Sequence, residues 1–75
     1  MTGSPTAAVH AARLQLASRL REIRKDAGLT STELARRLDW YPSKVSRIEH
    51  ARTPPAITDI RVWCAAAEPR TRRMI

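Results

Sequence analysis

The sequence has little of the material from which nucleotide loops, disulfides and metal sites are built. Its 75 residues include two glycines, one cysteine and no phenylalanine. Gly3 and Gly28 lie too far apart to form one phosphate-binding loop, and Cys64 alone can form no internal disulfide. Cysteine and histidine do not occur at metal-ligand spacing. The sequence therefore excludes a glycine-rich nucleotide site and predicts a domain without a metal or another cofactor.

Long apolar runs and catalytic groupings are also missing. Residues 1–12 contain no basic start followed by an apolar run of signal-peptide length, and no stretch approaches the roughly eighteen apolar residues of a membrane span. His10 and His50 are far apart in the sequence, and neither has an acidic cluster beside it. We therefore expect a cytoplasmic protein with no enzymatic activity and no membrane partner.

Positive charge is the most prominent feature that is present. Fourteen Lys and Arg against seven Asp and Glu give a net charge of +7, and all of the cations except Lys25 and Lys44 are Arg. Such a charge on a small surface favours a polyanion, and the planar Arg side chain suits phosphates and guanine edges. The codon bias of a GC-rich genome is an alternative explanation for the Arg content. Charge alone therefore indicates nucleic acid as a partner without assigning a function.

The apolar residues predict one all-helical domain. The chain is 43% hydrophobic but only 4% aromatic, so its core must consist mainly of Leu, Ile, Val and Ala, which favours helices. A first helix is predicted over residues 6–27 and ends at Gly28. Its apolar face is formed by Ala12, Leu16, Leu20, Ile23 and Ala27. Residues 1–5 read as a polar leader, and residues 68–75 as a basic tail or a truncated fifth helix.

Three shorter helices complete the predicted domain, which spans residues 6–67. Thr30 and Glu33 match a capping box at the start of the second helix, and Pro42 fits the first position of the third, which stops near residue 50 or 51. The predicted buried positions of these two helices are Leu34, Ala35, Leu38, Val45 and Ile48. Trp40 is expected to pack against Val45 as a hydrophobic staple. The inner face of the fourth helix is predicted to contain Ile60, Trp63, Cys64 and Ala67.

Two short helices joined by a three-residue turn, in a small basic domain, are typical of helix-turn-helix DNA binding. The run of residues 28–38, followed by residues 43–49, resembles the Xre/Cro family of lambda-repressor-like helix-turn-helix domains. The resemblance covers roughly residues 16–67. Residues 52–55 and 60–64 look like the subgroup found at the N-terminus of larger bacterial transcriptional regulators.

This resemblance implies a compact, all-α fold of four to five helices and a recognition helix over residues 42–50 in the major groove. The implied partner is double-stranded DNA, bound as a homodimer on two half-sites within the nucleoid, with a C-terminal effector domain outside this chain. A structural salt bridge between Arg24 and Glu49 is also implied. An antitoxin-like protein-interaction domain of the same fold is the alternative function.

Nine residues around the second and third helices are predicted to contact DNA. They are Ser31, Thr32, Tyr41, Ser43, Lys44, Arg47, His50, Arg52 and Thr53. The resemblance implies that Ser43, Lys44 and Arg47 face base edges, whereas the other six contact the phosphate backbone. For each residue the alternative is an ordinary solvated or capping side chain. The family's usual Asn-Gly after the recognition helix is replaced here by His50-Ala51.

Overall fold

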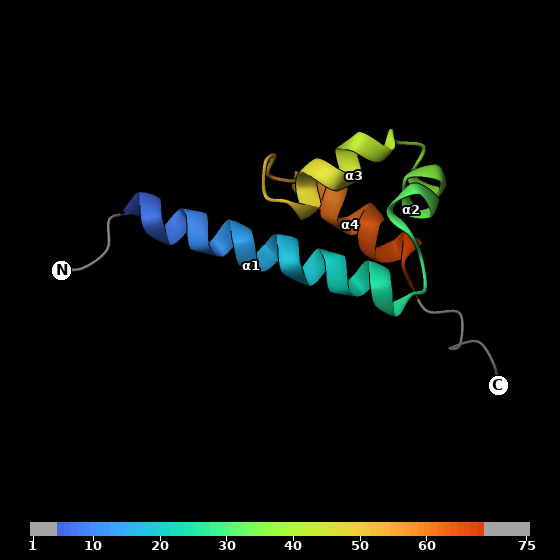
Figure 1. Cartoon of the computed structure of the whole chain (residues 1–75), viewed down its shortest axis with the longest axis horizontal. Coiled ribbons are helices and arrows are strands. Elements are labelled where there is room, and N and C mark those ends of the chain that lie inside the picture. The colour runs from blue at the N-terminus through green and yellow to red at the C-terminus, as the bar shows by residue number, and fades with distance from the viewer. Residues whose placement is uncertain (1–4, 69–75) are drawn as a thin grey trace.

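The computed structural model describes residues 5–68, which form four helices and no strand. They are α1 (Pro5–Asp26), α2 (Ser31–Leu38), α3 (Pro42–Glu49) and α4 (Ile57–Ala66). Helices α2, α3 and α4 gather on one side of α1 (Figure 1). This arrangement confirms the predicted all-helical fold. Residues 1–4 of the predicted leader and residues 69–75 of the predicted tail lie outside the described range.

The core lies where the four helices meet. Its buried cluster consists of Leu20, Leu29, Leu34, Ala35, Val45, Ile48, Trp63 and Ala67. Trp63 has no exposed surface, and its indole Nε1–H donates to the carbonyl of Leu20 at 3.0 Å. Burying a large apolar side chain contributes on the order of 3 kcal/mol, and the hydrogen bond avoids the cost of an unpaired buried N–H. Trp63 therefore joins α4 firmly to α1.

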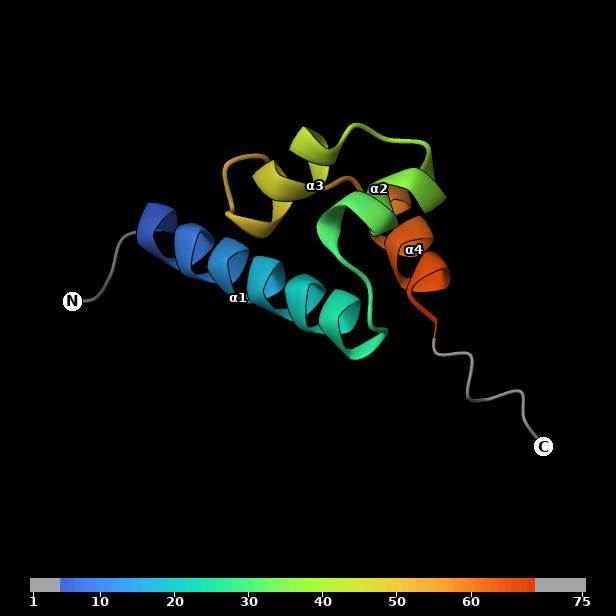
Figure 2. The ribbon, with the colours of Figure 1, turned by 45° about the vertical axis from the view of Figure 1, so that its right-hand side comes forward.

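Two of the predicted core positions are exposed. The prediction for Ala12 is wrong because the first turns of α1 extend beyond the helices that cover the rest of it (Figure 1, Figure 2). Val9 lies on the same stretch of α1 and is half exposed. The prediction for Cys64 is also wrong. Cys64 follows Trp63 by one residue, and that step turns its side chain by about 100° around the helix, away from the core.

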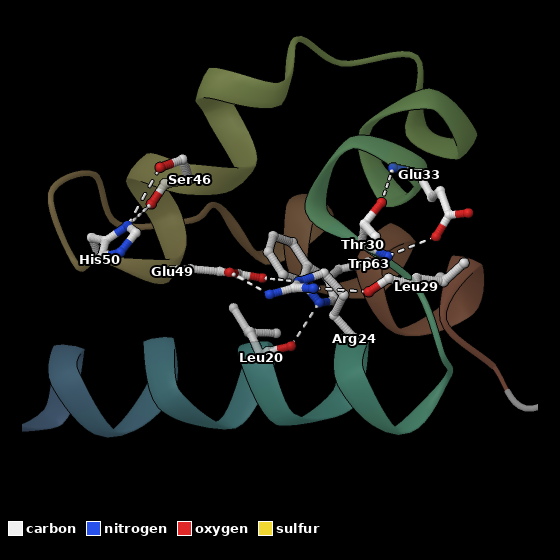
Figure 3. Close-up of polar contacts among 9 residues, drawn as sticks. All are labelled: Leu20, Arg24, Leu29, Thr30, Glu33, Ser46, Glu49, His50 and Trp63. Carbon is white, nitrogen blue, oxygen red and sulfur yellow. Dashed lines mark hydrogen bonds and ion pairs between the residues drawn. The ribbon is translucent and has the colours of Figure 1, made fainter.

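Local sequence signals set the end of α1 and the start of α2. Gly28 adopts a left-handed φ of +75°, and the buried Leu29 follows it into the core. The Thr30 hydroxyl accepts a hydrogen bond from the Glu33 amide at 3.0 Å, while the Glu33 carboxylate accepts one from the Thr30 amide at 2.8 Å (Figure 3). These two bonds confirm the predicted capping box and fix the residue at which α2 begins.

Candidate nucleic-acid interface

Helices α2 and α3 are joined by a three-residue turn that is bonded to both helices. Asp39 takes the left-handed conformation, with φ at 61°, and its amide donates to the carbonyl of Arg36. Trp40 packs against the core, and its ring meets that of Trp63 edge to face with 6.2 Å between centroids. Pro42 is the first residue of α3, as predicted. The angle between the two helices is therefore set by hydrogen bonds and packing.

Helix α3 has a buried face and an outer face. Val45 and Ile48 are buried, whereas Ser43 and Arg47 are exposed on the opposite side of the helix. Tyr41, directly before α3, is 81% exposed and makes no side-chain bond to the helix end. The structure thus places three of the predicted contact residues on an accessible surface around the start and middle of α3.

Lys44 does not lie on this outer face, so the prediction that it shares a face with Ser43 and Arg47 is wrong. It is one residue from Val45, and at about 100° per residue its side chain leaves the flank of α3 beside the core. Its ammonium lies 4.0 Å from the centroid of the Trp40 ring and 3.5 Å from Oδ1 of Asp59 in α4. The protein itself therefore supplies both partners of this cation.

The segment after α3 folds back onto the end of the helix. The amides of Arg52 and Thr53 both donate to the carbonyl of Arg47, at 2.8 and 3.3 Å, while their side chains are exposed. Ala51 takes a left-handed φ of 58°. Glycine adopts this conformation without steric cost, whereas alanine does not. Ala51 is held in it because the chain turns back here to bring the Arg52 and Thr53 amides to the Arg47 carbonyl.

His50 is exposed at the C-terminal end of α3 and bonds to its own helix. Its Nδ1 lies 2.8 Å from the carbonyl oxygen of Ser46 (Figure 3). Because a carbonyl oxygen only accepts, this bond requires the proton on Nδ1. In the neutral ring, Nε2 is then an acceptor, and donation from Nε2 to a phosphate would require the charged form.

The N-terminus of α2 carries two of the predicted phosphate contacts. Thr32 is exposed and Ser31 is half-buried. The backbone hydrogen bond with Thr30, and then the bond with its hydroxyl, lower the pKa of Glu33, so that its carboxylate stays charged in this helix turn. Since the Glu33 amide is already used by the cap, the hydroxyls and the backbone amides of Ser31 and Thr32 are the groups that this end offers to a phosphate.

Arg24 and Glu49 form a bidentate ion pair between α1 and the last residue of α3. Arg24 Nε lies 2.6 Å from one carboxylate oxygen of Glu49, and Nη2 lies 3.1 Å from the other (Figure 3). A third bond runs from Arg24 Nη1 to the carbonyl of Leu29 at 2.8 Å. The two charged side chains are only 12% and 5% exposed. One guanidinium therefore connects α1, the segment before α2 and the end of α3.

Sequence reasoning missed two residues at this surface. Asp59, the carboxylate partner of Lys44, is absent from the predicted site residues. Its sequence signal is an acidic side chain in the first turn of α4, three residues after Ala56, whose amide it caps. Arg36 lines an open groove of about 260 Å³ beside the turn, together with Thr32, Ala35, Trp40 and Pro42. Its place four residues after Thr32, on the same helix face, is a signal that could have found it.

The described part of the chain offers neither a metal cluster nor a membrane helix. Among residues 5–68, no three His, Cys, Asp or Glu side chains lie together in a way that could hold a metal ion. None of the helices in the same range is long and apolar enough to cross a membrane.

Comparison with known proteins agrees with this geometry. A family model described as a helix-turn-helix domain matches residues 15–68. The matched range begins within α1 and contains all of α2, the turn, α3 and α4. No curated protein matches the sequence. Because the family model covers more than half of the chain, the chain belongs to the helix-turn-helix domain family.

Proposed function

We propose that this domain binds double-stranded DNA in a sequence-specific manner, with α3 in the major groove. The observation that carries the proposal is the outer face of α3, where Ser43 and Arg47 lie exposed opposite the buried Val45 and Ile48. An Arg in that position has the length and the paired donors to bond guanine O6 and N7 together. The net charge of +7 supplies attraction to the phosphate backbone.

Exposed polar residues on either side of α3 support the same orientation. Tyr41 precedes the helix, and Arg52 and Thr53 follow it, all three with exposed side chains. Contacts from such flanking groups to phosphates fix the register of a helix on DNA but carry no sequence information directly. Affinity would thus come from both ends of α3 and discrimination from its middle.

The proposal extends to the type and setting of the domain. We infer an Xre/Cro-type module of a bacterial transcriptional regulator that binds two half-sites as a homodimer, with an effector domain outside this chain. The resemblance of residues 28–38 and 43–49 to that family supports this assignment, and the helix-turn-helix family match supports the DNA-binding fold on which it builds. The proposed role is binding without catalysis.

A salt titration with random duplex DNA tests the proposal, followed by selection of a preferred sequence. If roughly six phosphates are neutralised per domain, log affinity falls with a slope of about −5 against log salt concentration. Selection should then enrich one sequence, with α3 facing it. With this slope, a rise in salt concentration from about 50 to about 200 mM should lower the affinity roughly a thousandfold. An affinity that stays constant over this range would exclude DNA as the main partner and favour the alternative of a protein-interaction domain.

A further inference from the structure

We propose that Lys44 is a positioning residue that holds the first turn of α3 against α4 and does not itself read bases. The proposal concerns the Lys44 cluster, which consists of Trp40, Lys44 and Asp59. The Lys44 ammonium lies over the Trp40 ring at 4.0 Å and 3.5 Å from Oδ1 of Asp59. The side chains of Lys44 and Asp59 are 40% and 20% exposed, so the pair is partly shielded from water. The consequence for DNA rests on the proposed function, whereas the contacts themselves do not.

Both partners of Lys44 are held in place by other parts of the chain. The Trp40 ring packs edge to face on Trp63, which is buried and bonded to the Leu20 carbonyl of α1. Asp59 uses its second oxygen, Oδ2, to accept a hydrogen bond from the Ala56 amide at 3.0 Å. Lys44 therefore meets an aromatic face and a carboxylate that are already oriented. When the cluster forms, Lys44 loses side-chain conformational entropy, but Trp40 and Asp59 lose little because they are already held in place.

The two contacts together make the flank of α3 the favoured place for this cation. An ammonium over an indole face is attracted by the ring quadrupole, and the Asp59 carboxylate adds an ion pair on the same side. To reach a base edge, Lys44 would have to give up both contacts. Ser43 and Arg47 are then the α3 residues that face bases, and Lys44 acts by setting the angle at which they are presented.

The substitution Asp59→Asn separates the two roles of Lys44 by the sign of its effect. Asn keeps an oxygen for the Ala56 amide but removes the charge that faces Lys44. Glu22→Gln is the matched control, because it also raises the net charge from +7 to +8 and affects only an exposed pair with Arg19. A positioning Lys44 predicts that Asp59→Asn weakens binding to the selected sequence about two- to fivefold relative to Glu22→Gln, with an unchanged salt slope.

The opposite result would overturn the proposal. If Lys44 contacts DNA, Asp59→Asn releases its ammonium, and binding becomes tighter than in the Glu22→Gln control. Lys44→Met provides the second test, since Met keeps the length of the stem and removes the charge. Lys44→Met should weaken binding to the selected sequence without changing the salt slope. Lys44→Arg should bind this sequence like the unchanged protein, because Arg also stacks on indole and pairs with carboxylate. A slope reduced by about one in Lys44→Met would identify Lys44 as a phosphate contact.

A measurement without DNA keeps this proposal distinct from the proposed function. Near-ultraviolet circular dichroism of the free domain reports the environment of its two tryptophans, Trp40 and Trp63. The signal should change in Lys44→Met and in Asp59→Asn, remain in Lys44→Arg and be unaffected by Glu22→Gln. Should the chain bind no DNA at all, the proposed function fails while these spectra still support the cluster. Spectra that are identical in all four variants would overturn the cluster whatever the DNA result.

Discussion

The ion pair between Arg24 and Glu49 offers the strongest test of how α3 is held. The perturbation is Glu49→Gln, which preserves the size of the side chain and removes its charge. The change leaves the Arg24 guanidinium 12% exposed beside a neutral amide, with the Leu29 carbonyl as its other acceptor. A buried cation without its counter-ion is costly because neither water nor a carboxylate compensates its charge.

The expected loss of stability follows from this burial. Breaking a buried pair by removing one partner costs about 3–5 kcal/mol, and we expect the lower end because Arg24 keeps a carbonyl acceptor. For a domain of this size, a loss of about 3 kcal/mol lowers Tm by about 12–24 °C. The same substitution in the exposed Arg19–Glu22 pair, Glu22→Gln, should cost less than about 0.5 kcal/mol. The contrast between the two pairs tests burial, since both join one Arg to one Glu.

Thermal and urea unfolding followed by circular dichroism measure this difference directly. DNA binding, measured below Tm where Glu49→Gln is still folded, should also weaken because the ion pair no longer fixes the C-terminal end of α3 on α1. If Glu49→Gln unfolds at the same temperature and urea concentration as Glu22→Gln, the pair does not hold α3. The burial argument would then be refuted, however short the two distances are.

Three further predictions concern single residues. Arg47→Ala should weaken binding to the selected site by about 1–3 kcal/mol and barely alter binding to random DNA, whereas an equal loss on both would make Arg47 a phosphate contact. Ala51→Gly should raise stability by about 0.5–1 kcal/mol by relieving its left-handed backbone, and Gly28→Ala should lower it by a similar amount; thermal unfolding of both tests the sign. The lowered pKa of Glu33 adds stability that is fully present above the ordinary value of 4.5 and is lost as the pH falls through the lower folded value, so Glu33→Gln should flatten the acid limb of a stability–pH curve.

Signals that act within a few residues made most of the fold predictable. The left-handed Gly28, the capping box that begins at Thr30 and the proline at the start of α3 each determine the local backbone without help from distant residues. Helix bounds and the buried pair Val45 and Ile48 follow from these signals and from apolar spacing. The error at Ala12 has a different origin. The spacing shows which face of α1 is apolar, but not how far along the helix its neighbours extend.

The environment of side chains at the edge of a helix face could not be predicted in the same way. Cys64 and Lys44 each lie about one residue step from a buried position, and for such a residue the neighbouring helix decides whether it is covered. Lys44 is partly shielded because Trp40 and Asp59 contact it, and Asp59 lies fifteen residues away in the sequence. The Cys64 side chain is left exposed. The spacing of apolar residues thus predicts burial at the centre of a helix face, whereas burial at its edges depends on tertiary contacts.

The orientation of α3 depends on contacts from both of its neighbours. An eight-residue helix is too short to be stable alone, so α3 takes its position from packing. Near its start, Lys44 contacts α4 through Asp59, and at its last residue Glu49 contacts α1 through Arg24. The two attachments lie on opposite sides of the exposed stretch that contains Arg47. Loss of either one should therefore leave α3 attached by its other end and change the angle of its outer face, while loss of both should weaken binding by more than the sum of the two single effects, because each contact holds the same helix when the other is gone.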